Sequence, residues 1–483
     1  MVKVRVSKDN YIYDVHSIVK AFFSGEEVKV YCNKEDEPTD EAEILMHIDY
    51  EQNAVHICLL VNGTIEYDGN SSETDYEDRS EYKNVLKRHI YYVLSNYTGK
   101  DLPWGTLTGI RPTKIAVKLV NEGLFDDEIV NHYKEVYLAG EKKSNLAVKI
   151  AHKELDILSG IHYEKGYSLY IGIPFCPTTC LYCSFTSFPR IAYEKKIHDY
   201  LECLKKEIDY VSKNFNDKVL DSVYIGGGTP TTLTASELDE LITYLKSKLD
   251  FSSVLEFTVE AGRADSITKD KLEKLLELGV TRISVNPQTF KQETLDIIGR
   301  RHTVDQVIEA YSLAREVGFD NINMDLIVGL PGERYEDVLA TMNKVKQLSP
   351  DSVTVHSLAI KRASRLNQWI TEHGIECISN SDEIMDMTSE ITEEMGLNPY
   401  YLYRQKNMSG NMENVGYALP GKEGIYNILI MEEVQTIVAL GAGTVTKRVY
   451  PDGRIERCDN VKDIDLYISK IDEMIERKKC LFS

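Results

Sequence analysis

From residue 167 onward, a short apolar run followed by a longer helical pattern occurs six times. The apolar runs lie at 168–175, 222–226, 256–261, 282–287, 321–330 and 352–359. Helical patterns separate them, for example at 193–214, 235–249 and 304–317. Nearly continuous apolar strands that alternate with helices predict a parallel sheet covered by helices. We therefore predict an α/β fold with a partial (β/α)6 parallel barrel, whose chemistry lies at the C-terminal ends of the strands.

The segments on either side of this repeat have different patterns. Strand-like runs at 2–6, 43–48, 54–61 and 64–67, with helical patterns at 81–95 and 126–158, predict an N-terminal mixed α/β domain over 1–165. The pair Asn62-Gly63 is typical of a hairpin turn. The repeat gives a barrel domain over 166–395. The alternation of strands and helices ends at about residue 395. We predict a small C-terminal domain over 396–483 that covers the substrate.

Charge and hydropathy restrict the partners of the chain. Its 483 residues hold 56 Lys and Arg against 77 Asp and Glu, a net charge of −21, which argues against binding nucleic acid or anionic membranes. The sequence contains no run of 18 apolar residues, so it predicts no membrane-spanning helix. Its N-terminus does not resemble a signal peptide. The last four residues, beginning at Cys480, fit a prenylation pattern, which we interpret as chance. We predict a cytoplasmic protein and favour a monomer.

Three of the nine cysteines follow the first strand of the repeat. Cys176, Cys180 and Cys183 form the pattern CxxxCxxC on one predicted loop. A zinc site normally needs a fourth ligand, and the nearest histidine, His198, lies in a predicted helix. Three thiolates suit a 4Fe–4S cluster with one iron left open to bind another ligand. We interpret these cysteines as the metal ligands and the catalytic centre, and the other six as small hydrophobic residues.

This motif, with an aromatic residue before its third cysteine, resembles the radical SAM superfamily. The resemblance implies a 4Fe–4S cluster and S-adenosylmethionine (SAM) as cofactors. In that superfamily the open iron binds the amino and carboxylate groups of SAM. One electron from the reduced cluster then gives a 5′-deoxyadenosyl radical, which abstracts a hydrogen atom from an unactivated carbon.

Polar and glycine residues at successive strand ends extend the resemblance. Each has an ordinary explanation alone, but together, over about residues 165 to 450, they resemble the oxygen-independent coproporphyrinogen III dehydrogenases, in a branch with a long N-terminal extension. That family holds two SAM molecules. The resemblance implies that the cluster-bound SAM contacts Tyr170, Tyr182, Gly227 and Glu260. The second would contact Gly228, Thr229, Gln288, Arg300, Asp325 and Ala359. Val445 would approach the first adenosyl group.

The reaction implied by the family is oxidative decarboxylation of coproporphyrinogen III. Two propionate side chains become vinyl groups, which gives protoporphyrinogen IX in anaerobic haem biosynthesis. The expected partners are a tetrapyrrole substrate and an electron donor protein such as flavodoxin or ferredoxin. Because this substrate carries four carboxylates, we expect arginine guanidinium groups to bind it. The candidates near strand ends or in the tail are Arg263, Arg300, Arg301, Arg362, Arg365 and Arg404. Aromatic cover is expected from Tyr400, Tyr401 and Tyr403.

Two alternatives stay open. Haem-binding chaperones of the superfamily share the cluster motif and usually carry His-Asn-Leu-x-Tyr-Trp in the tail, where this chain has Tyr426-Asn-Ile-Leu-Ile-Met431. A radical SAM methyltransferase acting on a tetrapyrrole is the other. The chain also departs from many relatives at Asn286-Pro287-Gln288, where they have Gly-Val-Gln, so its substrate is less secure than its SAM chemistry.

Overall fold

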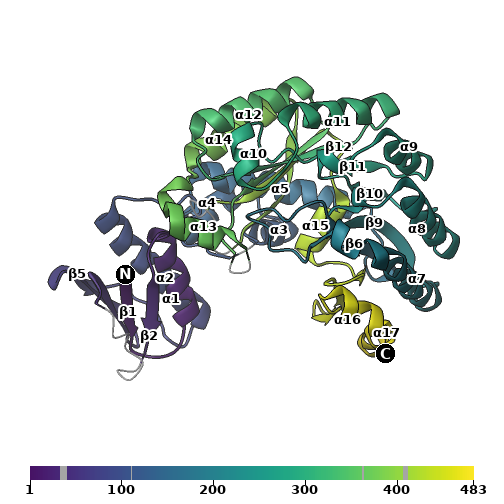
Figure 1. Ribbon diagram of the computed structural model, residues 1–483. Helices are drawn as coiled ribbons and strands as arrows, with labels where there is room; N and C mark the ends of the chain where they lie inside the picture. Colours follow the sequence, from purple (N-terminus) through teal and green to yellow (C-terminus); the bar gives the residue numbers. More distant parts are fainter. Residues whose placement is uncertain (33–40, 110, 362–363, 406–411) are drawn as a thin grey trace. The chain divides into compact units, whose positions relative to one another are not determined.

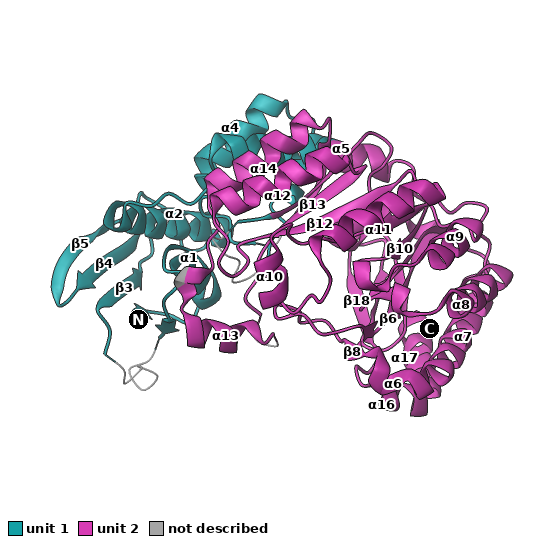
Figure 2. Cartoon of the chain, turned by 45° about the horizontal axis from the view of Figure 1, so that its top comes forward, with its two compact units in different colours: residues 1–152, 404–413 teal, residues 153–403, 414–483 magenta. Residues whose placement is uncertain are grey.

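The computed structural model describes residues 1–32, 41–109, 111–361, 364–405 and 412–483. The chain divides into two compact units (Figure 2): residues 1–152 with 404–413, and residues 153–403 with 414–483. Residues 153–165 therefore belong to the second unit. The division into three domains at 165 and 395 stays a prediction.

The first unit is built on a five-stranded sheet in the order β2-β1-β3-β4-β5. The strands are β1 (Val2–Val6), β2 (Val28–Tyr31), β3 (Ile44–Tyr50), β4 (Val55–Val61) and β5 (Thr64–Asn70). Asn62 and Gly63 both have positive φ, as the predicted hairpin turn requires. Alternate residues of β3 and β4 are buried and share a core with α1 (Ile12–Phe22) and α2 (Arg79–Thr98). The predicted mixed α/β architecture is confirmed.

The helical pattern at 126–158 is two helices, so the prediction of one continuous element was wrong. α4 (Asp126–Tyr137) ends at Leu138, which has φ 55°, and α5 (Glu141–Leu158) begins after Gly140. The apolar periodicity continues across this break, because both helices bury one face. The sequence also gave no prediction of α1, β2 or α3 (Thr113–Asn121).

The second unit contains an eleven-stranded sheet, in the order β14-β15-β13-β12-β11-β10-β9-β6-β16-β17-β18. Seven consecutive strands of this sheet are parallel, and six of them are the six predicted ones: β6 (Gly166–Ile173), β9 (Val219–Gly227), β10 (Glu256–Glu260), β11 (Arg282–Ser284), β12 (Ile322–Val328) and β13 (Ser352–Ser357). This confirms the parallel α/β prediction. Figure 1 shows helices following one another along the sheet: α7 (Ile197–Asn214), α8 (Ala235–Lys248), α9 (Lys269–Glu277), α11 (Val304–Val317) and α12 (Tyr335–Leu348).

Strand register gives the two faces of this parallel block different chemistry. Residues side by side on paired parallel strands share a face. One face carries buried apolar side chains such as Leu169, Val223, Phe257 and Ile283. The other is largely polar: Tyr170, Tyr224, Thr258, Glu260, Arg282, Ser284, Asn323, Asp325, Thr354 and His356. The polar face is therefore where a site can form.

Residues from 396 onward extend the sheet at both ends. β14 (Asn398–Tyr403) and β15 (Asn414–Ala418) join antiparallel beside β13. β16 (Ile437–Leu440) pairs in parallel with β6, followed by β17 (Val445–Val449) and β18 (Ile455–Asp459). The sheet stays open, with β6 and β13 apart in the strand order. The remaining elements of this unit are β7 (Phe175–Cys176), β8 (Phe188–Pro189), α6 (Arg190–Tyr193), α10 (Gln292–Ile297), α13 (Leu366–His373), α14 (Asp382–Glu394), α15 (Ile425–Glu432), α16 (Ile464–Ser469) and α17 (Ile471–Phe482).

Within the described ranges, no helix is both long enough and apolar enough to cross a membrane.

Candidate active site

The three cysteines lie on the loop that leaves β6, and all three are free and half-buried. The loop is fixed to the segment after α10, because Leu181 N donates to Ile298 O at 3.0 Å and Thr178 Oγ1 donates to Gly299 O at 3.0 Å. Leu181 and Tyr182 also pack against the apolar cluster that includes Leu295 and Ile298. The loop is thus held at the C-terminal end of the sheet.

The cysteine thiols influence one another. Burial raises the pKa of Cys176 to about 11, the Thr229 hydroxyl at 3.5 Å opposes this, and Cys183 and Cys180 raise the pKa further. Burial also raises the pKa of Cys183. With their pKa values raised, the thiols of Cys176 and Cys183 are protonated at neutral pH and need a bound cation to hold them as thiolates.

The spacing of the three sulfurs does not suit one small ion. Among the residues that the structure describes, a single group of His, Cys, Asp or Glu has three ligand atoms all within 4.8 Å, and the cysteines do not form it. Around one zinc ion, with Zn–S bonds of about 2.3 Å, three sulfurs would lie that close. A wider iron–sulfur cluster, with each cysteine on its own iron, fits a loop of this kind.

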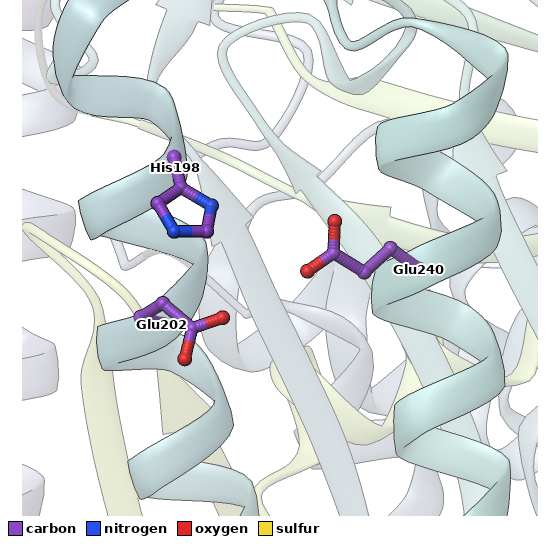
Figure 3. Close-up of side chains that lie close together, drawn as sticks. All are labelled: His198, Glu202 and Glu240. Atoms are coloured by element: carbon purple, nitrogen blue, oxygen red, sulfur yellow. The ribbon is translucent and has the colours of Figure 1, made fainter.

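The group that does lie within 4.8 Å is His198, Glu202 and Glu240 (Figure 3). His198 and Glu202 point from α7 toward Glu240 on α8. The three side chains are exposed, and Lys205 Nζ already donates to both glutamates. The His198 side chain therefore lies beside Glu202 and Glu240 between α7 and α8, and we do not assign it as a fourth metal ligand with the three cysteines.

The glycine segment after β9 allows a close backbone approach to the cysteine loop. Gly228 N donates to Ile173 O and Thr229 N donates to Phe175 O, both at 2.8 Å. A Cβ at Gly228 would lie 2.7 Å from Phe175 O and 2.9 Å from Ile173 O. Gly227 has φ 107°, which favours glycine. Sterics thus require glycine at both positions.

Three tyrosine rings stack beside this segment. Tyr170 on β6 stacks on Tyr224 of β9 with ring centroids 6.0 Å apart, and Tyr426 of α15 stacks on both, at 5.8 and 4.5 Å. Tyr224 Oη donates to Glu260 Oε1 at 2.6 Å. Burial raises the pKa of Glu260 to about 7, against the lowering effect of the Tyr224 hydrogen bond, and nearby Asp325 raises it further. Glu260 is therefore poised between its charged and neutral forms near neutral pH.

Gln288 and Arg300 carry buried polar atoms without a partner. Gln288 has φ 65° and joins the edge of β12 through backbone bonds to Asp325 and Ile327. Arg300 donates to the carbonyls of Gly262 and Asn286 and to Tyr182 Oη at 3.3 Å. Within the described part of the chain, Gln288 Oε1 and Arg300 Nε have no hydrogen-bond partner. Such orphaned atoms are expected where a polar ligand is to bind.

Asp325 is held by several neighbours. Its Oδ1 accepts from Asn323 Nδ2 at 2.7 Å and lies 3.8 Å from His356 Nε2, while Tyr403 Oη lies 3.3 Å from His356 Nδ1. Burial alone would raise the pKa of Asp325, but His356 and Asn323 lower it overall. Asp325 is thus an anion beside Glu260, whose pKa lies near 7.

The two remaining residues predicted to contact SAM are Ala359 and Val445. Ala359 lies two residues beyond β13 and is half-buried, while Val445 begins β17 and is exposed. Neither position tests the predicted contact with SAM.

The predicted propionate-binding arginines have different environments. Arg263 and Arg300 are buried, and their guanidinium groups donate mainly to protein partners, so neither presents an exposed group to a substrate carboxylate. Arg404 is buried in the first unit, where it donates to Leu107 O. Arg301 and Arg365 are exposed, and Arg365 contacts Thr179 O of the cysteine loop. Arg362 lies outside the described residues.

The sequence interpretation missed Tyr224, Tyr426 and His356 as site residues. Tyr224 could have been found, because it stands in register with Tyr170 on the neighbouring predicted strand. His356 occupies the polar face of β13 two residues after Thr354, a signal that strand alternation provides. Tyr426 reaches the stack from a helix near the end of the chain, and no local pattern indicates that contact.

Comparison with known proteins agrees with this geometry. The family profile of the Radical SAM superfamily matches residues 170–345. The oxygen-independent coproporphyrinogen-III oxidase-like protein HemZ of Bacillus subtilis (strain 168) is 40% identical over 410 residues, covering 84% of this chain and 82% of that protein. The heme chaperone HemW of Lactococcus lactis is 32% identical over 281 residues, covering 58% of this chain and 69% of that protein. The structure of coproporphyrinogen III oxidase HemN from Escherichia coli matches with TM-score 0.50 and 22% identity, over 66% of this chain and 72% of that chain, and supports the fold.

Proposed function

Because the chain belongs to the radical SAM superfamily, and within it to the oxygen-independent coproporphyrinogen-III oxidase-like family, we propose that it oxidatively decarboxylates propionate side chains of coproporphyrinogen III. The observation that carries the proposal is that Cys180 of the cysteine loop contacts Arg263, which follows Glu260 and the end of β10 at the polar face of the sheet. Family membership implies a 4Fe–4S cluster and SAM. When bound, these groups supply a one-electron reduction and a carbon-centred radical that takes a hydrogen atom from the substrate.

The residues of the chain would divide the work as follows. Cys176, Cys180 and Cys183 hold the cluster. Glu260, supported by Tyr224, accepts hydrogen bonds from the first SAM, with Tyr170, Tyr182 and Gly227 around it. Gln288 and Arg300 offer their unpartnered buried atoms to a second SAM, alongside Gly228, Thr229, Asp325 and Ala359. Val445 completes the first adenosyl pocket.

The substrate would be a large apolar ring with four carboxylates. Each reacting propionate loses one hydrogen atom from its β-carbon to the adenosyl fragment, then carbon dioxide and one electron, and a vinyl group remains. The electron passes to an external acceptor. Of the candidate arginines, Arg301 and Arg365 keep exposed guanidinium groups and are our choices for the carboxylates.

An anaerobic turnover experiment tests this function. Cluster-loaded protein is incubated with dithionite, SAM and coproporphyrinogen III, and the products are followed by mass spectrometry. We expect a vinyl-bearing product together with 5′-deoxyadenosine. Deoxyadenosine without any decarboxylated product would sink the proposal, and a methylated tetrapyrrole would indicate a methyltransferase.

A haem-binding chaperone is the second candidate, supported by the similarity to HemW. The position of the chaperone motif's histidine is occupied here by Tyr426, which is buried in the tyrosine stack and offers no imidazole to haem iron. This substitution favours the oxidative function. Stoichiometric haem binding without turnover would reverse the preference.

A further inference from the structure

Arg263 contacts Cys180 of the cysteine loop. Its Nη1 is 3.7 Å from Cys180 Sγ and donates to Thr178 Oγ1 at 3.0 Å. The side chain is 3% exposed. The sequence suggested it as a ligand for substrate carboxylates, but its Nη1 is directed into the cysteine loop.

Asp265 fixes the direction of this guanidinium. Arg263 Nε and Nη2 donate to the two oxygens of Asp265 at 2.9 and 2.6 Å, a two-pronged pair that leaves Nη1 facing the sulfur. Burial would raise the pKa of Asp265, but His302 and Arg263 beside it hold the pKa well below its ordinary value. The pair is therefore charged, with its positive end toward Cys180.

Arg300 adds a second buried cation on the same side. Burial opposes its charge, but Tyr182 and Cys180 beside it raise the pKa of Arg300. Cys180 thus has a direct guanidinium contact, whereas Cys176 contacts the neutral Thr229 hydroxyl and feels the charge of Arg263 only from farther away. The asymmetry is built by the chain itself and does not depend on any substrate.

We propose that Arg263, oriented by Asp265, is a positioning residue that raises the reduction potential of the 4Fe–4S cluster by donating an N–H to the sulfur of Cys180. Reduction adds one negative charge to the cluster. A nearby positive charge and a hydrogen bond to a ligand sulfur stabilise that extra charge, so they favour the reduced form. This inference rests on the cluster that the proposed function requires, but not on the identity of the substrate.

The test is a potentiometric titration of cluster-loaded protein, without substrate, followed by electron paramagnetic resonance. Arg263→Gln is compared with the wild type and with Arg190→Gln. Arg190 is a matched control, because it forms a similar two-pronged pair with Glu237 and shows no contact to a cysteine sulfur among the described residues. Arg263→Lys is a second variant that keeps the charge but loses the guanidinium fork.

We expect Arg263→Gln to shift the reduction equilibrium toward the oxidised cluster at least tenfold, which is about 59 mV for one electron. Arg263→Lys should fall between it and the wild type, and Arg190→Gln should match the wild type. Equal potentials in Arg263→Gln and the wild type would overturn the proposal. Loss of the cluster from both Arg263 variants, with the cluster retained in Arg190→Gln, would also overturn the proposal. Arg263 would then be needed for cluster binding itself and not for setting the reduction potential. Failure to decarboxylate coproporphyrinogen III leaves the measured potential, and thus this inference, intact.

Discussion

Tyr224 Oη donates a hydrogen bond to Glu260 Oε1 across 2.6 Å. The bond crosses from β9 to β10 beside Gly227, whose backbone also hydrogen-bonds to the Glu260 carboxylate. It stabilises the carboxylate against the effect of burial, which raises the pKa of Glu260 to about 7. Tyr224 therefore sets how much of Glu260 is charged at neutral pH.

This relationship predicts a pH dependence of SAM binding. If the carboxylate of Glu260 accepts hydrogen bonds from SAM, affinity falls as pH drops through about 7, by up to tenfold per pH unit. Tyr224→Phe removes a group that lowers the pKa, so the midpoint of the profile should move to higher pH. The measurement is the SAM dissociation constant of cluster-loaded protein against pH.

Tyr167→Phe is the matched control, because Tyr167 is buried on β6 and packs against Phe215 away from Glu260. Its profile should match that of the wild type. A midpoint that does not move in Tyr224→Phe would contradict the assigned role of the Tyr224 hydroxyl.

Gly228→Ala should damage the cysteine loop. The new Cβ would meet the backbone of Phe175 and Ile173 at less than 3.0 Å, and backbone atoms cannot move aside as a flexible side chain can. We expect a loss of about 1–3 kcal/mol in stability and a lower iron content after reconstitution. Gly160→Ala, whose Cβ would meet only Ile157 O at 3.6 Å, serves as the control. Normal iron content in Gly228→Ala would show that the two segments are less closely packed than described.

Cys180→Ser should abolish the visible absorbance of the cluster, since it removes one of three ligand thiolates. The check is the absorbance spectrum with the iron and sulfide content of anaerobically reconstituted protein. Cys480→Ser, at an exposed cysteine of the C-terminal helix, should keep the full cluster. A normal cluster in Cys180→Ser would mean that the ligands are assigned wrongly.

Lys478→Met should destabilise the second unit strongly. Lys478 Nζ donates to Glu207 Oε1 at 2.6 Å, and both side chains are entirely buried. Removing the lysine leaves an unpaired buried carboxylate, at a cost of about 3–5 kcal/mol. The measurement is urea unfolding followed by circular dichroism. Lys479→Met, next in sequence but exposed, should cost far less.

A double variant separates charge from packing. Glu207→Gln combined with Lys478→Met removes the stranded charge and keeps polar atoms for Tyr467 and Gly441, which now bond to Glu207. It should be more stable than Lys478→Met alone. Equal stability would show that the lost packing of Lys478, and not the stranded charge, causes the destabilisation.

The six parallel strands could be predicted because each is an apolar run long enough to be buried on its own and separated from the next by an amphipathic helix. The residues at the strand ends could be located from the same alternation of strands and helices. The Glu207–Lys478 pair could not be predicted, because it joins residues 271 positions apart in sequence. The contact of Arg263 with Cys180 could not be predicted for a related reason: its partner Asp265 is near in sequence, but its direction toward Cys180 depends on how the cysteine loop returns to the sheet.

We propose that this site removes a hydrogen atom from a propionate β-carbon. The most direct measurement uses coproporphyrinogen III deuterated at the propionate β-carbons, with analysis of the 5′-deoxyadenosine formed under anaerobic reducing conditions. We expect deuterium in the deoxyadenosine, in step with release of carbon dioxide and appearance of vinyl groups. Deoxyadenosine that carries no deuterium, or no carbon dioxide released, would contradict it.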